Sequence, residues 1–270
     1  DVLCNNEIKF KAFVDYAQKF NPDYIAMGHY AQIDNNGTHP KLTRAFDSNK
    51  DQTYFLSQLK EDQLKNVLFP IGHLDKKEVR KIAIEQDLAT ATKKDSTGIC
   101  FIGERHFNEF LSNYLPAQPG LMKKLDGTVI KEHRGLMNYT IGQRKGLGIG
   151  GSKSDTGAWY VVGKDLKTNT LYVEPNDEHP YLYSDSALIT DVIWRGEKIQ
   201  GKMTAKFRYR QKDHPVDIKW IDEKTILVSY PQKVRSVTPG QVCAFYQNET
   251  CLGAGFIQEA YMDKKIRQYS

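Results

Sequence analysis

The stretch EIKFKAFVDYAQKFNPDYIAMGHY, residues 7–30, decides the fold class of the N-terminal part of the chain. Apolar residues recur in it every three to four positions, which predicts an amphipathic helix over 7–20 with a stripe of Ile8, Ala12, Phe13, Tyr16 and Ala17. The Asn-Pro-Asp turn that follows leads into an apolar run at 24–27, which we expect to be a buried strand. A helix followed by such a strand is typical of an α/β sheet, where ligands bind at the carboxyl ends of strands. Gly28 and His29 fall at this end.

Two further helices are predicted at 59–67 and 76–88, so the first hundred residues are expected to form an α/β fold. One more helix is expected at 105–115. Pro116 and Pro119 then break the helical pattern, which predicts a domain boundary close to this point.

The C-terminal half of the chain is predicted to contain strand-like runs at 158–165 and 170–175, and from about residue 183 to consist of strands only. Residues 120–178 are rich in glycine and carry the hairpin signal Asp126-Gly127. Runs of alternating residues then recur at regular spacing, which predicts a small antiparallel barrel or sandwich. These runs lie at 187–194, 203–210, 216–221, 225–230, 241–247 and 251–261. We therefore expect three domains, at 1–112, 113–180 and 181–270.

Composition and charge narrow the class of protein but do not assign a function. Of 270 residues, 40% are hydrophobic and 26% are charged, as in ordinary soluble proteins. The apolar runs are far shorter than the roughly 20 residues of a membrane-spanning helix, so we expect no membrane contact and a cytoplasmic location. The net charge of +5 suits a polyanionic partner and equally suits many enzymes. Four scattered cysteines without metal-site spacing favour a reducing compartment and no structural metal.

Each cysteine admits two interpretations. Cys4 stands just before the predicted helix, where a helix N-terminus can activate a thiol, but lone cysteines are more often buried apolar residues. Cys100 lies in DSTGICFIGER, residues 95–105, whose glycine and hydroxyl residues suit a tight loop better than a strand interior. It is either a packing residue or a reactive thiol. Cys243 and Cys251 alternate with apolar residues in predicted strands, which favours packing for both.

Two basic segments fit either a nucleic-acid contact or an ordinary solvated surface. IGQRKGLGIGG, residues 141–151, lacks the pattern of a nucleotide P-loop, so it is either a phosphate-contacting loop or an ordinary mobile one. KFRYRQK, residues 206–212, is predicted as a strand with Lys206, Arg208, Arg210 and Lys212 on one face and Phe207 and Tyr209 on the other. Arginines beside a tyrosine suit RNA phosphates and bases.

Taken together, these motifs resemble one family, the bacterial-type tRNA-specific 2-thiouridylases, which replace oxygen by sulfur at C2 of the wobble uridine. The similarity runs nearly from end to end in the family's order: DVLCNNEIKFKAF, MGHYAQI, SNKDQTYFLSQL, FPIGHLDKKEVRKIA, KKDSTGICFIGER, IGQRKGLGIGG, FRYRQ and TPGQVCAFY. The resemblance implies a multidomain α/β and β protein. Residues 1–112 would be the remainder of an adenine-nucleotide alpha-hydrolase-like (PP-loop ATPase) catalytic domain, 113–180 a central tRNA-contacting domain, and 181–270 an antiparallel β-barrel.

The resemblance also implies a chemistry. ATP, with Mg²⁺, adenylates the uridine oxygen, and a sulfur nucleophile then displaces AMP. The cysteine matching Cys100 receives sulfur as a persulfide from a sulfur-relay protein or cysteine desulfurase. Cys4 matches the second catalytic thiol, which attacks the persulfide and either frees the sulfur or ends in a disulfide with Cys100. Asp1 matches a residue that contacts the target base and could act as general acid or base.

The remaining matches are substrate contacts. Gly28 matches an ATP contact and His29 a tRNA contact. The other positions implied to bind tRNA, the last three of them on the barrel at the anticodon arm, are Lys50, Asp51, Gln52, Arg208, Tyr209 and Gln241.

The departure from the family lies in the ATP site. The family begins with a glycine-rich segment of type SGGVDSS that binds ATP phosphates, and this sequence does not contain it. We therefore expect a truncated chain that is inactive alone. The alternative is a tRNA-binding fragment without catalysis.

Overall fold

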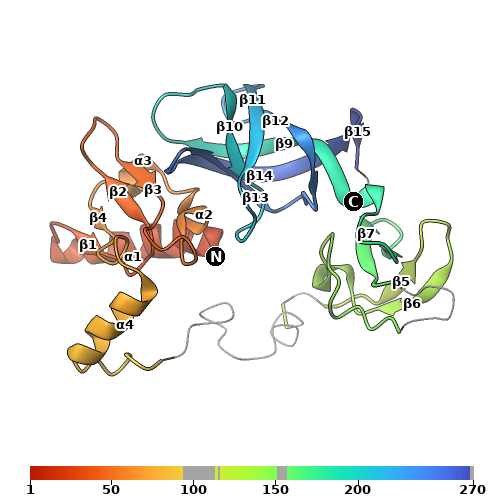
Figure 1. Cartoon of the computed structure of the whole chain (residues 1–270), viewed down its shortest axis with the longest axis horizontal. Coiled ribbons are helices and arrows are strands. Elements are labelled where there is room, and N and C mark those ends of the chain that lie inside the picture. Colours follow the sequence, from red (N-terminus) through yellow and green to blue (C-terminus); the bar gives the residue numbers. More distant parts are fainter. Residues whose placement is uncertain (94–112, 115, 151–156, 268–270) are drawn as a thin grey trace. The chain divides into compact units, whose positions relative to one another are not determined.

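The computed structural model describes residues 1–93, 113–114, 116–150 and 157–267 (Figure 1). Cys100 and the predicted helix at 105–115, apart from residues 113 and 114, lie outside this range. The chain divides into two compact units, each built from segments far apart in sequence. Unit 1 comprises Asp1–Asp95, Ile189–Val228 and Val242–Phe256, and unit 2 comprises Ser96–Leu188, Ser229–Gln241 and Ile257–Ser270.

The N-terminal helix covers the predicted range but begins before it, at Val2, and a different face is buried. Its helical turns are η1 (Cys4–Ala12), α1 (Phe13–Ala17) and η2 (Gln18–Phe20). Phe10 is buried against the rings of His29 and Phe69. Ile8 and Tyr16, in contrast, are 58% and 57% exposed. The predicted stripe is therefore wrong as a core face, because the described residues bury another side of the helix.

A parallel strand pair confirms the α/β character of the N-terminal part. β1 (Ile25–Ala26) pairs with β4 (Val67–Leu68), and Ile25 lies opposite Val67. Both of these side chains are buried, whereas Leu68 is exposed. β1 ends just before Met27, so Gly28 and His29 lie beyond its carboxyl end, as predicted.

Three short helices complete this part: α2 (Thr53–Leu56), α3 (Glu61–Leu64) and α4 (Lys76–Glu85). The helix predicted at 76–88 has a strong local start signal, because the Asp75 carboxylate accepts hydrogen bonds from the backbone N–H groups of Lys77 (2.7 Å) and Glu78 (2.8 Å). The helix predicted at 59–67 is a single turn followed by β4. Within the described chain, no helix combines the length and apolar character needed to cross a bilayer.

A hairpin that the sequence analysis did not predict joins the α/β part to the barrel. It consists of β2 (Gln32–Asp34) and β3 (Lys41–Thr43). β3 pairs antiparallel with β14 (Thr250–Met262), with Leu42 opposite Cys251. One hydrophobic core runs across this junction and includes Phe10, Leu56 and Val67 together with Val242, Tyr246 and Cys251.

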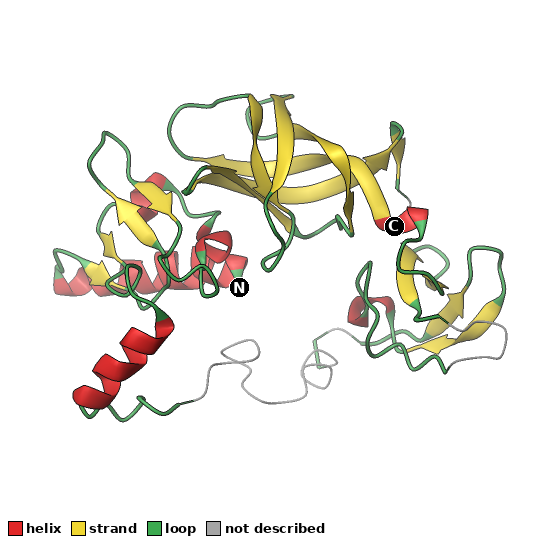
Figure 2. Cartoon of the chain, viewed as in Figure 1, coloured by secondary structure: helices red, strands yellow, loops and turns green. Residues whose placement is uncertain are grey.

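The barrel is antiparallel, as predicted, and closed. Its other strands are β9 (Tyr183–Trp194), β10 (Gly201–Lys206), β11 (His214–Trp220), β12 (Ile226–Arg235) and β13 (Val242–Gln247) (Figure 2). The strand order is β13-β10-β11-β12-β9-β14, and pairing of β13 with β14 closes it. A short strand, β15 (Lys265–Ile266), pairs with β14. Closure leaves no edge strand within the ring, which distinguishes the barrel from a sandwich.

Arg195 fastens the helical part of unit 1 to the barrel. Its guanidinium donates to the carbonyl oxygens of Ser57 (2.8 Å), Leu59 (2.6 Å) and Cys251 (2.6 Å), and the residue is 5% exposed. Hydrogen bonds to a charged group contribute about 1.5–3 kcal/mol each, more than neutral ones. The buried charge therefore holds the segment after α2 firmly against β14.

Unit 2 contains a small four-stranded sheet. Its strands are β5 (Gly120–Lys123), β6 (Val129–His133), β7 (Tyr160–Asp165) and β8 (Thr170–Glu174), in the order β6-β5-β8-β7. Two short 3-10 turns are η3 (Leu136–Asn138) and η4 (Pro180–Leu182). The predicted Asp126-Gly127 hairpin joins β5 to β6, and Gly127 has a φ of +91° that suits glycine.

The basic glycine-rich segment at 141–150 is pinned at its start. Gly142 N donates to Val161 O (2.8 Å), and Val161 N donates back to Gln143 O (3.0 Å). Gly142 has a φ of +79°, and a Cβ at this position would lie 2.0 Å from Ser236 Oγ. Both the backbone conformation and the close approach therefore require glycine here. Arg144 and Lys145 remain exposed.

We predict that Gly142→Ala destabilises the protein by about 1–3 kcal/mol, because the added methyl group overpacks the contact with Ser236. Gly146→Ala is the matched control, since Gly146 has a similar φ of +78° but the nearest atom to its Cβ position, Gln143 Nε2, lies 3.8 Å away. The midpoint of urea unfolding measures both. Equal midpoints for the two variants would contradict the steric argument.

Candidate active site and nucleic-acid interface

Cys4 lies within the first turn of the N-terminal helix and not just before the helix as predicted, because the helical turns begin earlier in the chain. The helical turns begin at Val2, and Asn5 N donates to Asp1 O at 2.9 Å, which closes this turn. The Cys4 side chain is a free, half-buried thiol. Asp1 is exposed one turn before it. A thiol and a carboxylate are thus carried on one turn, with the thiol partly open to solvent.

Asn5 anchors this turn from inside. It is 3% exposed, and its Nδ2 donates to Phe55 O at 3.2 Å. Its Oδ1 therefore faces His29 Nε2, 3.3 Å away, and this nitrogen must be the donor. The Cys4 turn is in this way tied both to the end of β1 and to α2.

His29 is a neutral group in this site. It is 8% exposed and lies against the rings of Phe10 and Phe69. Burial and, to a smaller extent, the charge of Lys9 together lower the pKa of His29 to about 4. His29 is therefore uncharged near neutral pH, so any contact with RNA would be a hydrogen bond or a ring contact and not a charge pair.

Gly28 is exposed at the carboxyl end of β1, and a Cβ built on it would meet nothing within 4 Å. This open backbone is compatible with a nucleotide contact. It does not make an ATP site alone, because phosphates need several converging N–H groups or cations. The described residues therefore do not fit ATP without further partners, and no reaction step is assigned to Gly28.

In the loop Lys50-Asp51-Gln52, the side chains of Asp51 and Gln52 bind backbone groups of neighbouring segments, and Lys50 is partly exposed. Asp51 is 7% exposed, and its carboxylate accepts hydrogen bonds from Ala45 N (3.1 Å) and from the Thr53 hydroxyl (2.8 Å). The Gln52 side chain accepts from Tyr30 N at 2.9 Å. Asp51 and Gln52 thus shape the loop, and half-exposed Lys50 presents a cation at its surface.

The prediction of a strand over 206–212 is wrong beyond Lys206. β10 ends there, and the next residues form a turn in which Gln211 Oε1 accepts from Phe207 N at 3.0 Å. Phe207 is fully buried, while Arg208 and Tyr209 are half-buried and Arg210 is exposed. The predicted alternation of faces therefore does not apply, because the chain leaves the sheet at this point.

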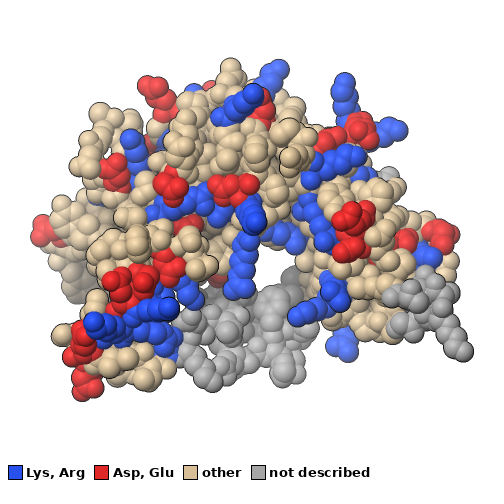
Figure 3. All heavy atoms as spheres, in the orientation of Figure 1, with Lys and Arg blue, Asp and Glu red and all other residues tan. Residues whose placement is uncertain are grey.

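Tyr209 brings the two predicted tRNA-contacting segments together. Its ring stacks on Phe55, with centroids 4.1 Å apart and planes tilted by 35°. Burial raises the pKa of Tyr209, as does the charge of Asp51, while Arg210 and Lys50 oppose the rise. All three charged residues therefore lie near the phenol. We call the group Lys50, Phe55, Arg208, Tyr209 and Arg210 the Tyr209 surface. Figure 3 shows Lys and Arg side chains below the barrel strands of this unit.

Gln241, Cys243 and Cys251 also lie outside this surface. Gln241 is exposed in the turn before β13 and belongs to unit 2. Cys243 and Cys251 are 0% and 1% exposed, which confirms the packing interpretation, and burial raises the pKa of both thiols. Cys100 is outside the described residues.

Two residues of the site were missed from sequence. Asn5 and Phe55 stand beside matched positions in the motifs DVLCNN and SNKDQTYF, and only their spacing to Cys4 and Gln52 hinted at a role. Their importance depends on contacts with His29 and Tyr209, which no local pattern specifies.

Comparison with known proteins agrees with this arrangement. Three family models match: a tRNA methyl transferase HUP domain over 1–104, a tRNA methyl transferase PRC-barrel domain over 108–175, and an aminomethyltransferase beta-barrel domain over 184–257. The tRNA-specific 2-thiouridylase MnmA of Acholeplasma laidlawii is 74% identical across all of this chain and 72% of its own length. Those of Phytoplasma australiense and Bacillus subtilis are 60% and 55% identical, over 100% and 97% of this chain and 72% and 71% of their own lengths. The chain, with its cysteine-bearing helix and its β-barrel, therefore belongs to the tRNA-specific 2-thiouridylases, a family of sulfurtransferases that modify tRNA.

Proposed function

We propose that this chain provides the thiol pair and the anticodon-arm grip for ATP-dependent 2-thiolation of the wobble uridine. Uridine O2 first attacks the α-phosphate of ATP, which releases pyrophosphate and leaves adenylated O2. The terminal sulfur of a Cys100 persulfide then attacks C2 and displaces AMP. The Cys4 thiolate next attacks Cys100 Sγ, which releases 2-thiouridine and leaves a Cys4–Cys100 disulfide. Alternatively, Cys4 attacks first and expels hydrosulfide, which displaces AMP.

One observation carries this proposal: Phe55 links the thiol-bearing turn to the Tyr209 surface. Its carbonyl accepts from Asn5, the residue after Cys4, and its ring stacks on Tyr209. An RNA bound by the cations and the aromatic ring of this surface would therefore have a defined position relative to the Cys4 turn. A base must leave its stack to be modified, so a grip on the surrounding stem has a mechanical purpose.

We further propose that adenylation needs polypeptide that covers the open face of the first helix. Ile8, Tyr16 and Phe20 are 58%, 57% and 73% exposed. β1 and β4 form only a two-stranded parallel sheet, and parallel sheets are usually covered on both faces. The covering part would supply the glycine-rich ATP loop, with Mg²⁺. A tRNA-binding fragment without catalysis is the second candidate, and the Tyr209 surface alone would suffice for it.

Loss of one phosphate contact should be visible in the salt dependence of tRNA binding. We predict that Arg208→Gln weakens binding and lowers the slope of log K against log salt by about 0.7–0.9. Tyr209→Ala should weaken binding by about 1–3 kcal/mol through lost stacking, with the slope unchanged. Lys219→Gln, an exposed site on β11, serves as the control. Wild-type binding that does not depend on salt would contradict the proposal.

We predict that, of the four cysteines, Cys100 alone carries the persulfide sulfur. After incubation with a cysteine desulfurase and cysteine, we expect a mass increase of one sulfur atom on the peptide containing Cys100, and none after Cys100→Ser. Cys243 and Cys251 are internal controls because both are buried. An adduct on either of them would show that the wrong cysteine was assigned.

The need for polypeptide that covers the open face of the first helix can be tested by adding such a segment to the chain. With ATP, Mg²⁺, tRNA and a sulfur donor, the 270-residue chain should produce no 2-thiouridine, whereas fusion to the remaining N-terminal segment of a relative should restore thiolation. Mass spectrometry of digested tRNA measures the product. Thiolation by the chain alone would refute the proposal, and tRNA binding without thiolation even in the fusion would favour the second candidate.

A further inference from the structure

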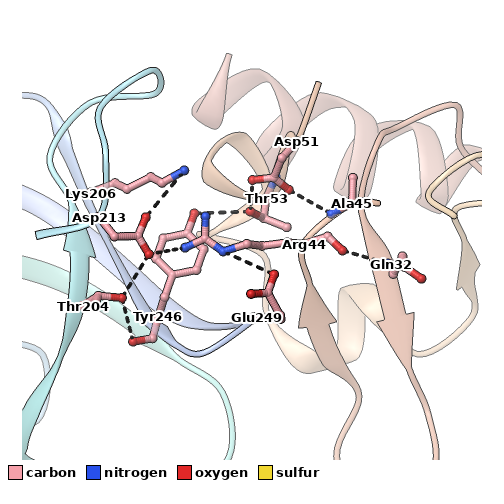
Figure 4. Close-up of polar contacts among 10 residues, drawn as sticks. All are labelled: Gln32, Arg44, Ala45, Asp51, Thr53, Thr204, Lys206, Asp213, Tyr246 and Glu249. Atoms are coloured by element: carbon pink, nitrogen blue, oxygen red, sulfur yellow. Dashed lines mark hydrogen bonds and ion pairs between the residues drawn. The ribbon is translucent and has the colours of Figure 1, made fainter. Parts of the chain in front are cut away.

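A chain of polar contacts joins the Lys50 loop to the turn that carries Tyr209, both in unit 1 (Figure 4). Arg44 follows β3 directly and reaches from the α/β part to the barrel. Its Nη2 donates to Asp213 Oδ2 at 2.6 Å, and its guanidinium lies over the Tyr246 ring, 4.0 Å from the centroid. Arg44 is thus held by an ion pair and a cation–π contact at once.

Asp213 closes the turn that carries Arg208 and Tyr209. It is the residue immediately before β11, and the same carboxylate accepts from Thr204 Oγ1 at 3.2 Å. Lys206 Nζ lies 3.7 Å from its other oxygen. Thr204 and Lys206 belong to the end of β10, so both ends of the turn meet at one carboxylate.

The contacts continue to the other segment through Tyr246. Its hydroxyl lies 3.3 Å from Thr53 Oγ1, which donates to Asp51 Oδ2 at 2.8 Å. Figure 4 shows Asp51 and Thr53 on the α/β side of this bridge and Asp213 on the barrel side. The bridge therefore runs from the Lys50 loop to the Tyr209 turn, and each member has a partner.

Arg44 carries a charge that is largely buried and paired. Its side chain is 15% exposed, and its charge is matched by Asp213, with Glu249 4.0 Å away. Burial is the largest single influence and lowers the pKa of Arg44, but Asp213, Tyr246 and Asp51 together outweigh it, so the pKa is raised. The guanidinium is therefore always charged and already paired, so it contributes geometry to RNA binding and not a phosphate contact.

We propose that Arg44 and Asp213 are positioning residues that hold the 207–213 turn in its RNA-binding form. This inference rests on the proposed function of the Tyr209 surface. It makes a prediction opposite to that of simple electrostatics. Asp213→Asn raises the net charge by one, which by itself would strengthen binding to RNA, yet loss of the bridge should weaken it.

The experiment measures binding of an anticodon stem-loop RNA at several salt concentrations, at a temperature where every variant is folded. Asp213→Asn should weaken binding roughly tenfold, whereas Asp217→Asn, an exposed change of equal charge on β11, should not. Arg44→Gln should weaken binding with an unchanged salt slope. Because the two residues act as one pair, the double variant should be no worse than the weaker-binding single variant.

The possible outcomes are distinct. Binding by Asp213→Asn as tight as that of Asp217→Asn overturns the inference, and so does a salt slope for Arg44→Gln reduced as in Arg208→Gln. If Asp213→Asn does not fold, Arg44→Lys decides: it keeps the charge but not the planar fork, and wild-type affinity would overturn the inference. Absence of salt-sensitive binding in the wild type refutes the proposed function itself.

Discussion

Antiparallel pairing of β3 with β14 is the constraint on which the rest of unit 1 depends. Leu42 opposes Cys251 in this pair, and both are buried in the core that spans the α/β part and the barrel. A slip of one residue would turn every side chain of β3 to the other face. The pairing therefore determines where Arg44 leaves the sheet, and so whether its guanidinium meets Asp213.

Buried polar groups determine the shape of the site, and a few exposed or partly exposed side chains remain accessible to a binding partner. Asn5, Asp51 and Arg195 are each almost fully buried and hydrogen-bonded to backbone groups. Leaving such groups unpaired would cost about 1–3 kcal/mol or more, so their partners are strongly specified. Among the positions matched to tRNA contacts, Asp51 therefore holds a loop in place, whereas Lys50 faces outward.

Local signals explain which elements could be predicted. The capping box at Asp75 and the alternating barrel strands are visible in the sequence, and both elements form. The face of the first helix could not be predicted, because Phe10 is buried through contacts with His29 and Phe69. For a similar reason, the sequence predicts a longer strand than the β10 that the structure forms. Alternation continues past Lys206, but the hydrogen bond between Phe207 and Gln211 turns the chain away from the sheet.

The sequence by itself determined the family, the α/β and barrel classes, and the two cysteines that are candidates for sulfur chemistry, because motifs and periodicities are local properties. Tertiary structure alone decided that Tyr209 stacks on Phe55 and that Arg44 pairs with Asp213, 169 positions away. Such pairs depend on strand register and on the shared core, which bring distant segments to within bonding distance. No local pattern encodes that distance, so the bridge beside the Tyr209 surface is a property of the folded chain.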